Sequence, residues 1–171
     1  MVRRDPDATG DERTLLTQFL DYHRATLLMK VDGLDREQMN TTTAASTLTL
    51  AALLKHLALV EDGWFRGTLL GEPPAPWWRH VDEDADPDWD FRTAAEDDPS
   101  DLIALYETAC DRSREAVAAL ASLDDLSVGT SRRTGERFSV RWILLHMIEE
   151  TARHNGHADL LREAIDGVTG E

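Results

Sequence analysis

The chain has 171 residues, enough for one domain that buries a hydrophobic core without disulfides or a structural metal. Its formal net charge of −15 opposes binding to phosphate backbones and to anionic membranes, which both need basic surfaces. We therefore expect neither nucleic acid nor a membrane among its partners. The single cysteine, Cys110, excludes an intramolecular disulfide and a CxxC-type zinc site, which fits a reducing compartment.

The first ten residues are polar and contain Pro6 and Gly10, without the apolar core of a signal peptide. They predict a disordered tail over residues 1–10. No apolar run in the sequence reaches membrane-spanning length, and no internal repeat divides it. We expect a single domain over residues 1–171 and a cytoplasmic location.

The first amphipathic pattern runs from Asp11 to about Asp32, with apolar residues recurring mostly at intervals of three and four. Gly33 supplies a stop signal for this predicted helix. The polar, threonine-rich residues 34–45 predict a loop with one helical turn.

A second helix is predicted from Ser46 or Thr47 to about Leu70, where Gly71 ends it. His56 lies at its middle. A lone histidine on an apolar helix is more often a packed core residue than a ligand, so His56 gains weight only from a partner on another helix.

Residues 71–97 form a long connection rich in proline and tryptophan. Its acidic part, Val81 to Asp98, is interpreted as a solvated loop. Its tryptophans, Trp77, Trp78 and Trp89, favour packing against the body of the protein, and a lid over a functional site is the alternative.

The third helix is predicted from Asp98, an N-cap followed by proline, to about Ser122. Cys110 falls on its apolar stripe, which indicates a structural, inert thiol. Residues 124–138 carry turn residues and predict a short extended pair.

The fourth helix begins after Ser139 and runs to Asp166, with Gly167 as its stop. Gly156 inside it predicts a kink or a close helix contact. Together the patterns predict an all-α protein, a four-helix bundle with a long crossover loop between the second and third helices.

Metal-capable side chains recur along the fourth helix at His146, Glu150 and His154. Each step of four residues turns about 40° around a helix, so only two of the three can aim well at one ion. Glu150 and His154 are the best pair, and His56 is the natural third ligand from the second helix. Two histidines and a carboxylate leave open positions on zinc or a similar ion.

The leftover polar residues Glu61, Arg153, His146 and His157 are candidates for contacts around such a site. The spacing is equally compatible with a charged surface helix in which Glu150 and His154 make ordinary ion pairs. A di-iron site is not indicated, because it needs Glu-x-x-His on each of two helices. The sequence also has no Gly-x-Ser-x-Gly elbow and no phosphate-binding glycine loop.

Two segments carry a family resemblance: KHLALVEDGWF (Lys55 to Phe65) and RWILLHMIEETARHNGHADLLREAIDG (Arg141 to Gly167). They resemble the DinB-like four-helix-bundle superfamily, and within it the actinobacterial branch similar to mycothiol-dependent maleylpyruvate isomerase. In that superfamily a histidine of the second helix and two ligands one turn apart on the last helix hold a metal. The resemblance implies His56, Glu150 and His154 as the ligands here.

The resemblance further implies a divalent metal, with zinc favoured over nickel, and a low-molecular-weight thiol such as mycothiol as cosubstrate. The expected activity is a metal-dependent thiol transferase or isomerase acting on a small electrophile. Arg153 and Glu61 are its candidate catalytic residues, and His157 and Trp64 are candidates for cosubstrate contacts. The alternative is a non-catalytic metal-binding or stress-related bundle. The family also allows a homodimer.

Overall fold

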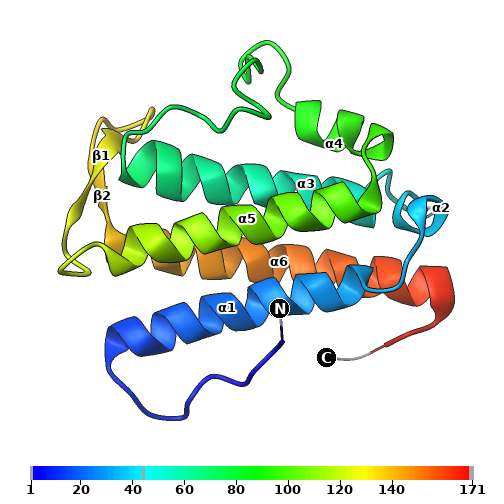
Figure 1. The fold of residues 1–171 in the computed structure, drawn as a ribbon, viewed down its shortest axis with the longest axis horizontal. Helices are drawn as coiled ribbons and strands as arrows, with labels where there is room; N and C mark the ends of the chain where they lie inside the picture. Colours follow the sequence, from blue (N-terminus) through cyan, green and yellow to red (C-terminus); the bar gives the residue numbers. More distant parts are fainter. Residues whose placement is uncertain (1, 44, 170–171) are drawn as a thin grey trace.

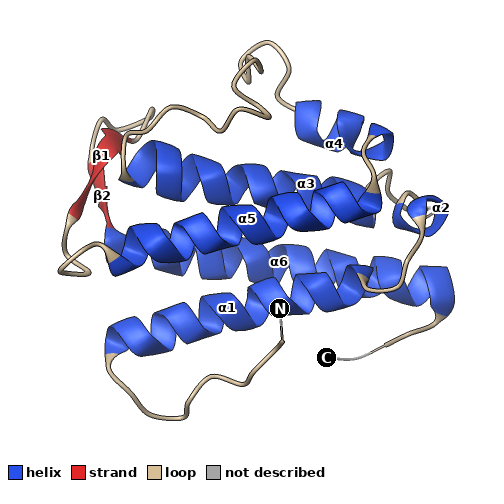
Figure 2. Ribbon diagram, viewed as in Figure 1, coloured by secondary structure: helices blue, strands red, loops and turns tan. Residues whose placement is uncertain are grey.

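The computed structural model describes residues 2–43 and 45–169, and four long helices dominate it (Figures 1 and 2). These are α1 (Glu12–Val31), α3 (Leu50–Glu61) continued by the π-helix η1 (Asp62–Leu69), α5 (Pro99–Ala118) and α6 (Val140–Asp166). The smaller elements are α2 (Arg36–Met39), α4 (Trp89–Thr93), the 3₁₀ turn η2 (Ala94–Glu96) and the strands β1 (Leu126–Thr130) and β2 (Arg137–Ser139). The predicted all-α bundle is confirmed, and the extended pair predicted over residues 124–138 is present as one short antiparallel hairpin.

The helices pack in two pairs, α1 beside α6 and α3 beside α5 (Figure 1). In Figure 1, α3 and α5 run in the same direction, opposite to α1 and α6. Consecutive long helices that run parallel require a connection that returns the chain along the bundle. The crossover between η1 and α5 does this, and it carries α4 back onto α3.

Local capping explains most helix ends. Asp11, Asp98 and Ser139 each accept a hydrogen bond from a backbone N–H of the first turn of α1, α5 and α6. The predicted start of the second helix at Ser46 or Thr47 is wrong. The helix begins at Leu50, because the Thr49 side chain caps it by accepting from the backbone N–H of Ala52.

The second helix does not remain an α-helix to its end. From Asp62 it widens into the π-helix η1, a form found mostly as short insertions within α-helices. Gly71, at φ 69°, terminates it, and a Cβ there would lie 2.5 Å from the Val128 side chain of the hairpin. A glycine is therefore needed both for the turn and for this close approach.

Gly156 does not kink α6. The helix is continuous from Val140 to Asp166, and a Cβ at Gly156 would meet nothing within 4 Å. The prediction of a kink or a close contact there is wrong, because the glycine lies on an exposed face.

The nucleophilic side chains Cys110, Lys30 and Lys55 are buried. Cys110 is 0% exposed, and burial raises the pKa of its thiol, as expected for a structural cysteine. Lys30 Nζ lies 2.7 Å from Asp159, and Lys55 Nζ lies 2.6 Å from Asp97. Both lysines therefore serve as interior anchors between elements.

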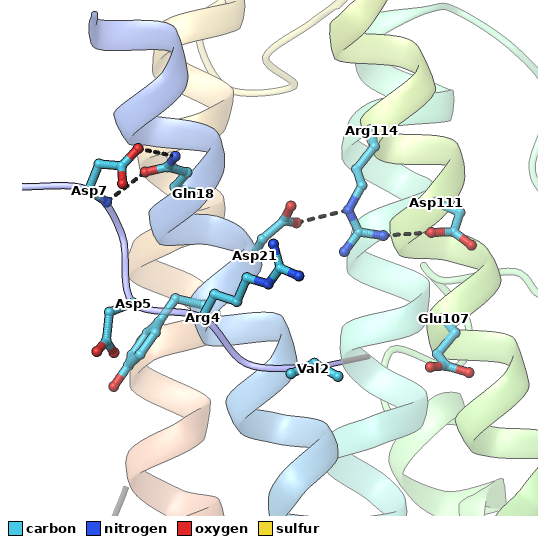
Figure 3. Close-up of a pocket in the computed structure, with 10 residues that line it drawn as sticks. Val2, Arg4, Asp5, Asp7, Gln18, Asp21, Glu107, Asp111 and Arg114 are labelled. Carbon is cyan, nitrogen blue, oxygen red and sulfur yellow. Dashed lines mark hydrogen bonds and ion pairs between the residues drawn. The ribbon is translucent and has the colours of Figure 1, made fainter. Parts of the chain in front are cut away.

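The amino-terminal segment, predicted as a disordered tail, lies along α1 in the structure. The Asp7 backbone N–H donates to the Gln18 side chain at 2.8 Å, and Gln18 Nε2 donates to the Asp7 carboxylate at 2.9 Å (Figure 3). A hollow of about 750 Å³ lies between this segment, α1 and α5, lined by charges of both signs. Within the described residues, no helix combines the length and apolarity needed to cross a membrane.

A buried ion pair joins α1 to the end of α3. Arg24 donates from Nε and Nη2 to the two Glu61 oxygens at 2.7 and 2.6 Å, and the residues are 3% and 0% exposed. Such a two-pronged arrangement fixes orientation as well as distance. Asp21 accepts a further bond from Arg24 at 2.9 Å, so the guanidinium is held on two sides.

We expect Glu61→Ala to lower the free energy of unfolding by about 3–5 kcal/mol, because it leaves the Arg24 charge buried without its main partner. Urea denaturation measures this change. The matched control is Glu149→Ala, which removes an exposed pair with Arg153 and should cost less than about 1 kcal/mol. Equal losses in the two variants would contradict a special role for the buried pair.

Candidate metal centre

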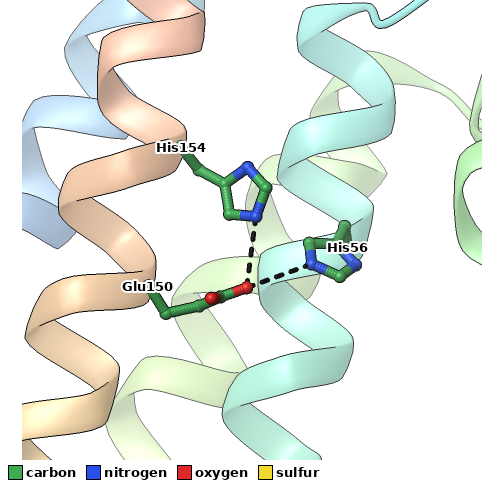
Figure 4. A group of neighbouring side chains, drawn as sticks. All are labelled: His56, Glu150 and His154. Atoms are coloured by element: carbon green, nitrogen blue, oxygen red, sulfur yellow. Dashed lines mark hydrogen bonds and ion pairs between the residues drawn. The ribbon is translucent and has the colours of Figure 1, made fainter.

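The candidate centre starts on α6, where Glu150 and His154 lie one turn apart. Their side chains point to the same side of the helix, and His154 Nε2 lies 3.1 Å from Glu150 Oε1 (Figure 4). The spacing of four residues produces this contact directly. The prediction that these two residues form the pair on this helix agrees with the geometry.

His56 reaches the same point from α3. Its Nε2 lies 3.5 Å from Glu150 Oε1, and its ring centre lies 5.0 Å from that of His154 (Figure 4). One ligand atom from each of the three residues falls within 4.8 Å of the others. The structure thus brings together two residues of one helix and a third that lies about a hundred positions away in the sequence.

The donor set fits a divalent transition-metal ion. Two imidazole nitrogens and a carboxylate oxygen are ligands that zinc and its neighbours accept. The three side chains are 13–19% exposed, so the point where they meet is reachable from solvent. Further ligands could therefore join them there.

Asp90 holds the other side of the His56 ring, and sequence reasoning missed it. Asp90 Oδ2 lies 2.7 Å from His56 Nδ1, and Phe91 stacks on the same ring with centres 4.5 Å apart. Metal-binding histidines usually place their second nitrogen against a carboxylate in this way, which fixes the ring and its tautomer. Nε2 is thereby left to face Glu150 and His154.

The interpretation of Val81 to Asp98 as a solvated loop is therefore wrong at Asp90, which is only 4% exposed. Lys55 anchors this part of the crossover to α3. Its Nζ donates to Thr93 Oγ1 at 2.8 Å and lies 4.4 Å from the centre of the Trp89 ring. Trp89 and Phe91, on either side of Asp90, could have indicated that this stretch packs against the protein, because aromatic rings within an acidic run need a surface to cover them.

His157 lies next to the centre, on α6. Its Nδ1 is 3.4 Å from Nδ1 of His154, the nitrogen that does not face Glu150. Trp64 instead contacts His146, one turn before Glu150 on α6, with ring centres 4.6 Å apart. Of the two predicted contact residues, His157 therefore touches a member of the cluster, and Trp64 touches a neighbour of it.

Arg153 and Glu61 do not join the cluster. Arg153 is exposed and pairs with Glu149 on the surface of α6. Glu61 is fully buried in its pair with Arg24. Of the two residues predicted as catalytic, Arg153 thus forms an ion pair on the surface of α6, and Glu61 forms one in the core.

The cluster favours positive charge. Burial alone opposes a charge on His56, but the hydrogen bonds and negative charges of Asp90 and Glu150 outweigh it and raise the pKa of His56 to about 9. Hydrogen bonds from His154 and His56, together with their charges, hold the pKa of Glu150 far below its usual range. A cation bound between the three side chains would thus contact the ionised carboxylate of Glu150.

Comparison with known protein families identifies the family to which this chain belongs. The model of the mycothiol S-transferase family matches residues 15–167. The chain belongs to this family. The predicted membership of the DinB-like superfamily is thereby confirmed. No match to this mycothiol S-transferase family member was found among curated proteins.

Two solved structures share the fold of this family member. A conserved protein from Enterococcus faecalis superposes with a TM-score of 0.71 at 15% identity, covering 94% of this chain and 100% of that one. YfiT from Bacillus subtilis gives a TM-score of 0.66 at 19% identity over 95% and 93% of the two chains. YfiT is described as "a probable metal-dependent hydrolase with an unusual four-helix bundle topology". At these identities the likeness shows the fold alone.

In protein stripped of metal by a chelator, we expect the His56 ring to titrate near pH 9, and Asp90→Asn to lower that midpoint. Histidine-resolved NMR titration measures both. A histidine pKa raised from 6.5 stabilises the fold fully below about pH 6.5 and loses this contribution as the pH rises through about 9. An unchanged midpoint in Asp90→Asn would show that the contact does not hold the ring.

Proposed function

We propose that this protein is a divalent-metal-dependent thiol S-transferase or isomerase, which uses a mycothiol-type thiol to act on a small electrophile. The observation that carries the proposal is the convergence of His56, Glu150 and His154 on one point in a member of the mycothiol S-transferase family. Zinc fits the donor set best, and nickel is the alternative.

In the proposed centre, His56 and His154 each contribute Nε2 and Glu150 contributes a carboxylate oxygen. A divalent ion held there supplies a Lewis acid that lowers the pKa of a thiol bound to it. Asp90 orients His56 through its Nδ1. Since Glu150 supplies the one negative charge of the ligand set, a net positive charge remains to favour a thiolate over a neutral thiol.

The reaction joins the thiol sulfur to the electrophilic atom. The thiol releases its proton, and in a displacement the leaving group departs with the electron pair of the broken bond. His157, which contacts His154, and Trp64, which contacts His146, are proposed to contact the cosubstrate. Arg153 on the rim is proposed to attract an anionic group, and Glu61 is proposed to act through the fold by holding Arg24.

We expect protein purified without chelator to contain about one divalent ion per chain. His56→Ala and Glu150→Ala should each remove most of it, because each deletes a ligand. Elemental analysis of the purified proteins measures this. Glu149→Ala is the matched control for Glu150, being its exposed neighbour, and should retain the metal. Equal metal content in all four proteins would exclude the centre.

We expect the metal-loaded protein to consume mycothiol in the presence of electrophiles, and Glu150→Ala to lower kcat/KM by more than about 100-fold. Thiol loss and product mass follow the reaction, and Glu163→Ala, which changes an exposed carboxylate near the end of α6, serves as the control. Stoichiometric metal without thiol consumption across a panel of electrophiles would favour the alternative, a non-catalytic metal-binding bundle.

A further inference from the structure

Four aromatic rings lie beside the candidate centre, at the junction of η1, β2 and α6. Trp142 lies near the rings of His146, Phe138 and Trp64, with centres 5.1, 4.5 and 5.4 Å away. Trp64 also meets Phe138 at 5.1 Å and His146 at 4.6 Å. These residues, Trp64, Phe138, Trp142 and His146, are called the aromatic wall below.

The aromatic wall follows the metal-capable residues along α6, turned about 40° around the helix at each step of four residues. Trp142, His146 and Glu150 follow one another at intervals of four along α6, and each interval rises about 6 Å. Trp64 lies two such intervals after His56 on the facing helix. A flat molecule resting on the wall would therefore have one end about one helical turn from Glu150.

Packing against the core at this end of the bundle accounts for Trp64 and Phe138, which are partly buried there, but it does not account for Trp142. Trp78 shows what a packed tryptophan looks like here, since it is 7% exposed and its Nε1 donates to Asp62 at 2.7 Å. Trp142 in contrast is 44% exposed, and His146 is partly exposed beside it. Ligand sites are typically lined by aromatic side chains that remain open in the free protein.

A groove of about 380 Å³ continues from the wall along α3 and η1. Val60, one turn after His56, lines it together with Trp64, Gly63 and Gly67. A Cβ on Gly63 would meet nothing within 4 Å, so the absence of a side chain there leaves the backbone open as a floor. The groove is large enough for a single aromatic ring with small substituents.

Charge limits the kind of molecule that can rest there. The groove is lined by one charge of each sign, Glu83 and Arg132, which lie 3.8 Å from each other and so offer no net charge to a ligand. The chain as a whole carries a formal net charge of −15, and Glu149 and Glu150 lie on the α6 turn next to His146, so an anionic ligand is disfavoured. The rings themselves attract a neutral aromatic face through stacking. The wall therefore fits a neutral, flat aromatic group.

We propose that the aromatic wall binds the aromatic part of a neutral electrophile and sets a preference for such substrates. This inference rests on the proposed function and names the substrate class. For an activated aryl halide, the thiol sulfur bonds to the ring carbon, the carbon–halogen bond breaks, halide leaves with its electron pair and the thiol proton passes to solvent. Trp142 acts here as the specificity-determining residue.

Binding is tested without turnover, using 2,4-dinitroaniline as a neutral ligand that does not react. We expect isothermal titration calorimetry to show about tenfold weaker binding for Trp142→Ala and nearly full binding for Trp142→Phe. Leu160→Ala is the control, because it removes another exposed apolar side chain of α6 away from the wall. Equal binding by wild type and Trp142→Ala would overturn the inference.

The second part of the test measures turnover. The quantity compared is the ratio of kcat/KM for 1-chloro-2,4-dinitrobenzene to kcat/KM for iodoacetamide. We expect Trp142→Ala to lower this ratio about tenfold, mainly through KM, and Leu160→Ala to leave it unchanged. An unchanged ratio in Trp142→Ala would overturn the inference while leaving the proposed function intact. If the wild-type protein showed no turnover but still bound 2,4-dinitroaniline in a way that depends on Trp142, the proposed function would be wrong and the aromatic site would be supported.

Self-association is the competing use of the wall. Sedimentation velocity of wild type and Trp142→Ala distinguishes it. A dimer that dissociates in Trp142→Ala, without any change in binding of 2,4-dinitroaniline, would overturn the inference in favour of a contact between two copies of the chain.

Discussion

The rotation of α3 about its own axis is the constraint on which the rest of the structure depends, and the Arg24–Glu61 pair helps to set it. Glu61 lies five residues after His56, so the two side chains point about 140° apart around the helix. With Glu61 held by α1 in the core, His56 is directed toward α6 and α4. A buried charge pair restricts the rotation of α3 strongly, because a rotated helix would leave both charges buried and unpaired.

The crossover makes the parallel arrangement of α3 and α5 possible, and its return path also serves the site. As it passes α3 it places Asp90 and Phe91 against His56, while Lys55 holds the same stretch through Thr93. Packing and function are therefore joined in one segment. Packing, the favoured interpretation of its tryptophans, is confirmed for Trp77, which packs against the core, and for Trp78, which is buried. In addition, α4 supports a ring that faces the candidate metal position.

Local patterns made much of this predictable. The caps at Asp98 and Ser139 and the pair Glu150 and His154 depend on residues within one turn of each other, so the sequence displays them directly. His56 could be chosen only through its partners on another helix, because nothing near it in the sequence marks it. Asp90 and the Arg24–Glu61 pair were missed since their partners lie 34 and 37 residues away. The π-helix was not predicted for a different reason: over two turns its apolar pattern differs little from that of an α-helix.

The burial of Cys110, Lys30 and Lys55 has a chemical consequence. They are all the cysteine and lysine residues of the sequence, and each is at most 5% exposed. Under the proposed function, the protein would bring electrophiles together with a thiol and would risk alkylation of its own thiol and amine side chains. An electrophile in solution would reach the Cys110 sulfur or either lysine amine only after the helices had separated. The fold would then leave the small thiol without competition from these side chains.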